Sequence, residues 1–166
     1  MGYNAYNATS YTSAVRGLQA SGQSFAANTA AQTTGSFKAA DILDVKGKVR
    51  ECCRAPGFAN NTPIIVALDC TGSMEEVPAQ LQKLLPELIT TIIQQGISDR
   101  PAVCFMGFDD EHVLPNASFQ MSQFETGDAE LLTALNNLII PSHGGGNGSE
   151  SYHAVFYAAA NCVKID

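Results

Sequence analysis

The segment Pro63–Asp69 constrains the fold more than any other part of the chain. It reads P-I-I-V-A-L-D, a continuous apolar run of β-branched character that ends in an acid. Such a run, without polar alternation, predicts a strand buried on both faces, as in parallel sheets that helices cover. The segment Ala102–Phe108 is also apolar throughout and predicts a second strand of the same kind.

Between these two runs, apolar residues recur every three or four positions, which predicts an amphipathic helix. The stripe consists of Val77, Leu81, Leu84, Leu85, Leu88, Ile89, Ile92 and Ile93. Gly96 ends this pattern, and Pro86 inside it predicts a kink or a split, because proline lacks the backbone donor. Residues 118–124 alternate and predict a half-exposed edge strand, while 128–140 and 149–163 predict further helices.

These elements predict an α/β fold class. We expect a three-layer, Rossmann-like sheet that is mostly parallel, with one antiparallel edge strand and helices on both faces. Residues 1–40 hold no acid and only the charges of Arg16 and Lys38, so we expect a low-complexity, poorly ordered arm. Residues 41–57 predict a lead-in, either a short helix or an extended segment, and residues 58–166 predict the folded domain.

Charge and hydropathy exclude several classes of partner. The net charge is −7 and only nine Lys and Arg residues are present, which argues against nucleic acid. No run approaches the roughly 18 apolar residues of a membrane helix. The first residues, MGYNAYNATS, lack the features of a secretory signal, so we expect a cytoplasmic protein with five reduced cysteines.

The residues that carry chemistry follow the first strand directly, as Asp69-Cys70-Thr71-Gly72-Ser73. Ligands of open α/β sheets collect at the carboxyl ends of strands. If the chain stays extended, alternate residues point the same way, so Asp69, Thr71 and Ser73 direct three oxygens to one point. One carboxylate and two hydroxyls are hard ligands that suit Mg²⁺ or Mn²⁺ better than zinc.

Simpler interpretations of the same acids and hydroxyls stay open. Ser73 and Glu76 form a Ser-x-x-Glu capping box, so the serine could serve the helix alone or serve both roles. The acids at 109–111 follow the second strand and are interpreted as a solvated loop.

A second motif is rich in glycine and precedes the last predicted helix. Residues 144–148 read G-G-G-N-G and lead into Ser149 and Glu150. Glycines permit close approach of the backbone, and a hydroxyl or carboxylate at a helix start could complete a metal site. No lysine follows as a phosphate-binding loop requires, and a flexible loop with a serine cap is the alternative.

Together the two motifs resemble the von Willebrand factor A domain and its metal-ion-dependent adhesion site. The family pattern D-x-S/T-x-S is matched by Asp69, Thr71 and Ser73. The resemblance implies a further ligand from a second loop, where Ser149 stands, with Glu150 or Asn147 as additional contributors. Two sequence segments are more similar to bacterial and phage-borne members than to extracellular ones, namely TPIIVALDCTGSM and GGGNGSESYHAVFYAAA.

The resemblance covers about residues 58–166. It implies an incomplete domain, because these residues correspond only to the first half of a family member. Family members continue with more strands, in the usual order 3-2-1-4-5-6. The strand Pro63–Asp69 would then lie at an unpaired edge, which invites another chain. We therefore expect self-association or completion by a separate chain, and weak binding of Mg²⁺ by the isolated protein.

The function that this implies is a non-catalytic module, in which bound Mg²⁺ coordinates an acidic residue of a partner protein. One alternative is a phosphatase of the haloacid dehalogenase type, with Asp69 as nucleophile. That chemistry needs a downstream lysine, and Lys164 is the only lysine after Lys83. A second alternative is a structural or assembly subunit in which the metal site is vestigial.

Overall fold

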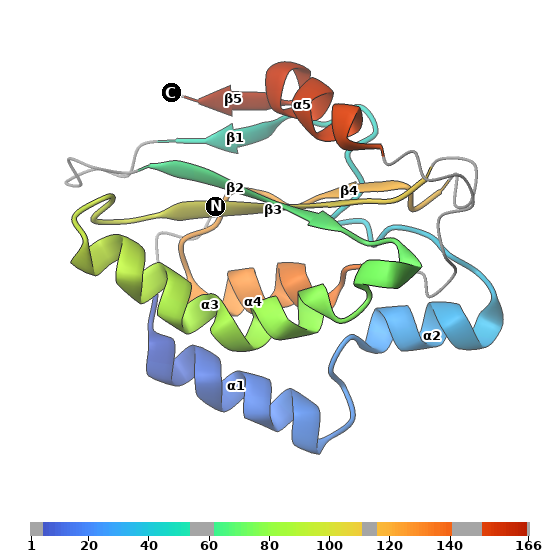
Figure 1. The fold of residues 1–166 in the computed structure, drawn as a ribbon, viewed down its shortest axis with the longest axis horizontal. Helices are drawn as coiled ribbons and strands as arrows, with labels where there is room; N and C mark the ends of the chain where they lie inside the picture. The colour runs from blue at the N-terminus through green and yellow to red at the C-terminus, as the bar shows by residue number, and fades with distance from the viewer. Residues whose placement is uncertain (1–4, 54–61, 111–115, 141–150, 166) are drawn as a thin grey trace.

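The chain folds into a mixed α/β structure, seen in a computed structural model that describes residues 5–53, 62–110, 116–140 and 151–165 (Figure 1). The described strands are β1 (Arg50–Cys52), β2 (Pro63–Asp69), β3 (Ala102–Phe108), β4 (Phe119–Met121) and β5 (Val163–Ile165). The described helices are α1 (Ala8–Ala20), α2 (Ala26–Thr34), α3 (Val77–Gln94), α4 (Asp128–Asn136) and α5 (Tyr152–Asn161), with a 3-10 turn at Gly72–Met74.

The strands β2, β3 and β4 form one sheet in that order. β2 and β3 run parallel, in a register that pairs Pro63 with Ala102 and Asp69 with Phe108. β4 pairs antiparallel with β3, and β1 and β5 form a separate parallel pair. The α/β class is therefore confirmed, with mostly parallel strands and an antiparallel edge strand.

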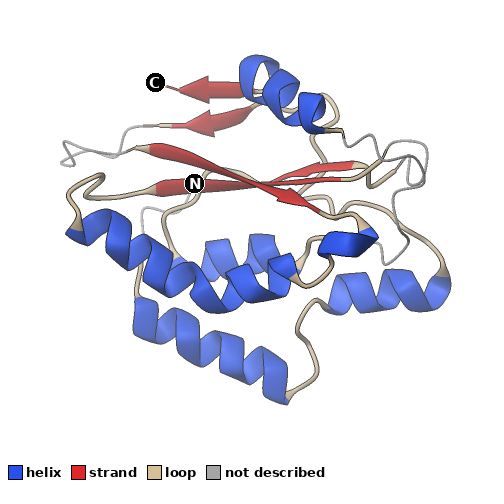
Figure 2. Cartoon of the chain, in the orientation of Figure 1, coloured by secondary structure: helices blue, strands red, loops and turns tan. Residues whose placement is uncertain are grey.

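Helices cover both faces of this sheet, with α3 and α4 below it and α5 above it in Figure 2. Along β3, Val103 and Phe105 point to one face and pack in a core with residues of α3 and α4. Cys104 and Met106 point to the other face and pack with Ala158 of α5. The period-two alternation of a strand thus divides the apolar run between two cores.

The expectation that both long strands are buried on both faces holds for β3 only. Every residue of β3 is buried, whereas most of β2 is half-buried and Ala67 is exposed. The reason is position: β3 lies between two strands, while β2 has a single hydrogen-bonded neighbour in the described sheet. β2 therefore lies at the edge of that sheet, where the strand order of the sequence analysis placed it.

Helix α3 is continuous, so the predicted split at Pro86 is wrong. Proline cannot donate to the carbonyl one turn earlier, which belongs to Gln82. The side chain of Gln82 is buried, accepts a hydrogen bond from Ser24 Oγ and donates to Asn136 Oδ1. Packing against neighbouring elements thus holds the helix through the proline. Gly96, at φ +66°, follows the helix end as predicted.

Residues 1–40 differ from the expected poorly ordered arm, because they contain α1 and α2. Tyr11 and Val15 of α1 enter the core that α3 and α4 share. Asn7 caps α1, since its side chain accepts a hydrogen bond from the backbone N–H of Ser10. The average composition of the segment does not predict this order, because it depends on a few apolar side chains that reach the core.

The remaining elements are shorter than the sequence pattern predicts. α4 ends at Asn136 and α5 at Asn161, where the predicted helices extend to residues 140 and 163. Within the lead-in, Arg50–Cys52 is extended and pairs with β5. In the part of the chain that the structure describes, no helix is both long and apolar enough to span a lipid bilayer.

Substitution of Gly107 tests the packing between β3 and its neighbours. A Cβ at this position would lie 3.0 Å from Leu138 Cδ2 and 3.1 Å from Cys70 Sγ, so Gly107→Ala should lower the free energy of unfolding by about 1–3 kcal/mol. The matched control is Gly17→Ala in α1, where a Cβ meets nothing within 4 Å and alanine should stabilise by about 0.5–1 kcal/mol. Urea denaturation measures both, and an unchanged Gly107→Ala variant would contradict the packing.

Candidate functional site

The motif predicted to carry chemistry lies at the carboxyl end of β2. Asp69 is the last residue of that strand, and its register partner Phe108 is the last residue of β3. The chain then turns through Thr71 into the 3-10 turn at Gly72–Met74 before α3 begins. The short turn keeps the motif beside the sheet edge.

Asp69, Thr71 and Ser73 lie side by side in this turn. The backbone N–H and the Oγ1 hydroxyl of Thr71 both donate to Asp69 Oδ1, at 2.9 and 2.7 Å. Thr71 Oγ1 lies 3.4 Å from Ser73 Oγ. Thr71, at the centre of this row, is buried, whereas Asp69 is half-buried and Ser73 is exposed, so both ends of the row lie closer to the surface than its centre.

Ser73 does not cap the long helix. α3 begins at Val77 with Glu76 at its cap position, and no side chain makes a capping hydrogen bond there. The capping-box interpretation is therefore wrong, because the 3-10 turn separates the serine from the helix start. The hydroxyl of Ser73 instead lies next to Thr71.

Tyr152 is a contributor that sequence reasoning missed. Its hydroxyl donates to the second carboxylate oxygen, Asp69 Oδ2, at 3.3 Å. Its ring packs against Phe108 with centroids 4.9 Å apart. The only sequence indication was position, because Tyr152 opens the helix that follows the glycine-rich motif.

A second carboxylate lies buried at the end of the neighbouring strand. Asp109 and Asp110 are 2% and 6% exposed, so the solvated-loop interpretation is wrong for both, while Glu111 lies outside the described residues. Asp109 Oδ1 accepts a hydrogen bond from the backbone N–H of Asp110, and the Asp109 N–H donates to Ser118 O. Parallel strands end at one sheet edge, which is why Asp69 and Asp109 come near each other.

Cys70 lies close enough to Asp69 and Asp109 for their negative charges to affect its thiol. Burial raises the pKa of the Cys70 thiol to about 12, with further contributions from the negative charges of Asp109 and Asp69. Its backbone N–H donates to Phe108 O at 2.8 Å, which continues the strand pairing past Asp69. The five cysteines form no disulfide among the described residues, and Cys52, Cys70 and Cys104 are buried.

The remaining predicted ligands fall outside the described residues. Ser149 and Glu150 belong to residues 141–150, as does the glycine-rich motif. The described chain resumes at Ser151, and α5 begins at Tyr152. The contribution of Ser149 and Glu150 thus remains a prediction, although the contact of Tyr152 with Asp69 shows that α5 begins beside the motif.

The donor groups present suit a small hard cation. Asp69 supplies a carboxylate, while Thr71 and Ser73 supply hydroxyl oxygens. The hydroxyl proton of Thr71 is directed to Asp69, so oxygen lone pairs stay available for a cation. Among the described residues, no three His, Cys, Asp or Glu side chains gather as a metal-ligand group.

Comparisons with protein-family models, with curated proteins and with solved structures find no match to this chain. The likeness to the von Willebrand factor A domain therefore rests on the sequence motifs alone. What the site does must be argued from its geometry and chemistry.

Thiol reactivity tests the environment of Cys70. A thiol with a pKa of about 12 has a thiolate fraction roughly a thousandfold lower at about pH 8 than an ordinary cysteine. Pulsed alkylation of the folded protein, followed by peptide mass spectrometry, should modify the half-buried Cys53 and Cys162 well before Cys70. In denaturant the cysteines should react at similar rates. Rapid modification of Cys70 in the folded protein would contradict the buried, acid-flanked site.

Proposed function

We propose that this protein is a metal-dependent protein-binding module. In this proposal Asp69, Thr71 and Ser73 hold Mg²⁺ or Mn²⁺, and the predicted Ser149 and Glu150 complete the ligand set. The observation that carries the proposal is the row of oxygens in which Thr71 Oγ1 lies 2.7 Å from Asp69 Oδ1 and 3.4 Å from Ser73 Oγ. Three oxygens from alternate residues gathered at a strand end match the chemistry that a hard cation requires.

The surroundings of Asp69 support accessibility of this site. Asp69 is half-buried, and among the described residues Asp69 Oδ2 accepts only a 3.3 Å hydrogen bond, from the exposed Tyr152. A contact of this length is weaker than a typical hydrogen bond between oxygens. Tyr152 can therefore yield this oxygen to a cation, while Thr71 keeps the carboxylate oriented through Oδ1.

The proposed role is binding, not catalysis. A bound ion would supply a coordination position that a carboxylate of a partner protein can take. Asp69 and Thr71 orient the ligand set, and the exposed Ser73 marks the side that a partner reaches. Nothing in this arrangement requires a nucleophile or a proton transfer. The net charge of −7 favours uptake of a cation over direct attraction of an acidic partner, so binding of an acidic partner should depend on the metal.

Binding of Mn²⁺, measured by the enhancement of water proton relaxation, tests the ligand set. Asp69→Asn should lower the affinity by at least tenfold, and Thr71→Val should also weaken it, because each variant removes a ligand oxygen or its negative charge. Thr71→Ser should retain binding because it keeps the hydroxyl. Asp99→Asn, an exposed acid before β3, serves as the control. Equal affinity for the wild type and Asp69→Asn would contradict the site.

An acidic peptide tests the partner chemistry. Penta-glutamate should bind the wild type in Mg²⁺, lose binding in excess chelator, and bind Asp69→Asn poorly, while penta-glutamine serves as the neutral control. Binding that persists unchanged in chelator would oppose a metal-dependent module.

A phosphatase assay distinguishes the proposed binding module from the alternative in which Asp69 is the nucleophile of a phosphatase. The wild type should not hydrolyse a generic aryl phosphate faster than Asp69→Asn does, because the proposed site only binds. Turnover that disappears in Asp69→Asn would favour the enzyme instead.

A further inference from the structure

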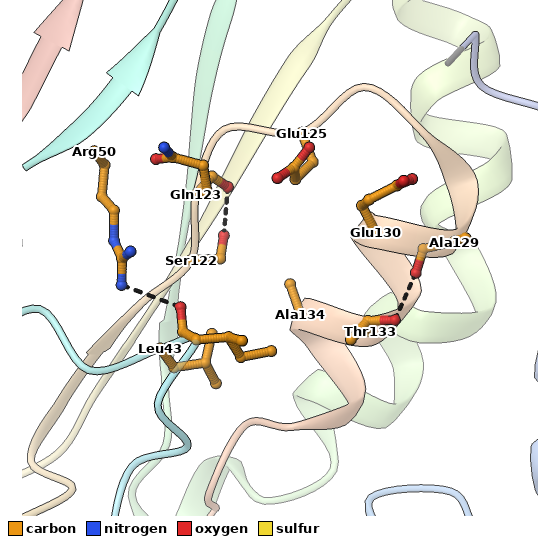
Figure 3. A pocket seen from close by; sticks show the side chains of 10 residues that line it. Leu43, Arg50, Ser122, Gln123, Glu125, Ala129, Glu130, Thr133 and Ala134 are labelled. Carbon is orange, nitrogen blue, oxygen red and sulfur yellow. Dashed lines mark hydrogen bonds between the residues drawn. The ribbon is translucent and has the colours of Figure 1, made fainter. Parts of the chain in front are cut away.

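A cavity of about 510 Å³ lies on the α4 side of the sheet and shares no lining residue with the Asp69 site (Figure 3). Its lining comes from three segments: Ile42, Leu43 and Arg50; Ser122, Gln123 and Glu125 after β4; and the first turns of α4. Glu125 pairs with Val103, five residues before the end of β3, which places this wall roughly 16 Å along the strand from the Asp69 edge. The volume is typical of small-molecule sites.

One wall of the cavity holds a buried cation. Arg50 is 8% exposed, and its Nη2 group donates to the carbonyl oxygens of Ile42, Asp44 and Met121 at 3.1, 3.1 and 2.7 Å. Its Nε is buried and has no hydrogen-bond partner among the described residues, and no described carboxylate lies within ion-pair distance of the guanidinium. Asp44 acts on this charge at longer range, but the printed hydrogen bonds of the guanidinium all go to neutral carbonyls, so a largely buried charge of this kind favours an anionic partner.

The opposite wall holds a buried acceptor. Figure 3 shows Glu130 on α4, across the cavity from Arg50. Glu130 Oε2 is buried and likewise lacks a hydrogen-bond partner in the described structure. Each such group that stays unsatisfied costs about 1–3 kcal/mol, and more when it is charged. The cavity is therefore lined by a guanidinium on one wall and a carboxylate on the other, and each of these groups also has a buried atom without a hydrogen-bond partner in the described structure.

The rest of the lining is half aliphatic and half polar, with Ser122, Gln123, Glu125 and Thr133 as the polar members. Ile42, Leu43, Ala129 and Ala134 contribute apolar surface. A simple anion such as phosphate would meet the negative charges of the glutamates, and a simple cation would meet Arg50. A molecule with both charges satisfies both walls at once.

We propose that this cavity binds a small aliphatic zwitterion, with its carboxylate at Arg50 and its ammonium group at Glu130. The aliphatic part then lies against the alanine and leucine side chains of the lining. This chemistry is shared by a free aliphatic amino acid and by a short aliphatic peptide with free ends. We expect this binding to be independent of the proposed metal at Asp69, because the two sites share no lining residue.

Calorimetric titration of the full chain with L-leucine and with L-leucyl-L-leucine tests the proposal and separates the two sources. At least one should bind, and its affinity should not change in excess chelator, which distinguishes this site from the proposed metal site. Leucinamide and N-acetyl-leucine, or the matching amide and acetyl forms of the dipeptide, each lack one charge and should bind at least tenfold more weakly.

Variants localise the binding. Glu130→Gln should lower the affinity at least tenfold, and Ala129→Leu, at an exposed helix position that lines the cavity, should abolish binding by filling it. Glu87→Gln on the exposed face of α3 is the matched control and should bind as the wild type does. Circular dichroism checks that each variant is folded. The proposal is overturned if neither ligand binds at millimolar concentration, if the singly charged analogues bind equally well, or if folded Glu130→Gln binds unchanged.

Discussion

The parallel pairing of β2 with β3 in a single register is the constraint on which the rest of the structure depends. It aligns Asp69 with Phe108, so the two strands end together and their acids lie at one sheet edge. It also assigns Val103 and Phe105 to one core and Cys104 and Met106 to the other. A slip of one residue would exchange these faces and move the motif away from Tyr152.

Two separate places on the sheet carry different chemistry. At the carboxyl end of β2, short side chains on alternate residues form a row of hard oxygens with Thr71 as its hydrogen-bonded centre. Beside β4, a single long side chain has a structural task. Arg50 joins the segment around Ile42 to the end of β4 through three carbonyl oxygens, and the same residue lines a cavity. One site is built from the backbone turn, and the other from packing between distant segments.

The long elements were predictable because their patterns are local. The bounds of β2 and β3 follow from two apolar runs, and α3 from a stripe of 3.6-residue period. The three-residue strands β1 and β5 were not predicted, since such short strands owe their conformation to pairing across the fold. The helices of residues 1–40 were missed because Tyr11 anchors them through tertiary packing that composition does not reveal.

Within the candidate site, spacing placed Asp69, Thr71 and Ser73 together. Tyr152 could not be foreseen, because its contact with Asp69 joins residues 83 positions apart.

The central claim is that Asp69, Thr71 and Ser73 hold one hard cation. The most direct measurement is the anomalous diffraction of crystals soaked in Mn²⁺, because the metal peak locates the ion independently of any assumed ligand. The account predicts a single strong peak in direct contact with the carboxylate of Asp69 and with the hydroxyl oxygens of Thr71 and Ser73. A peak elsewhere, or none at saturating Mn²⁺ with the three side chains well ordered, would contradict it.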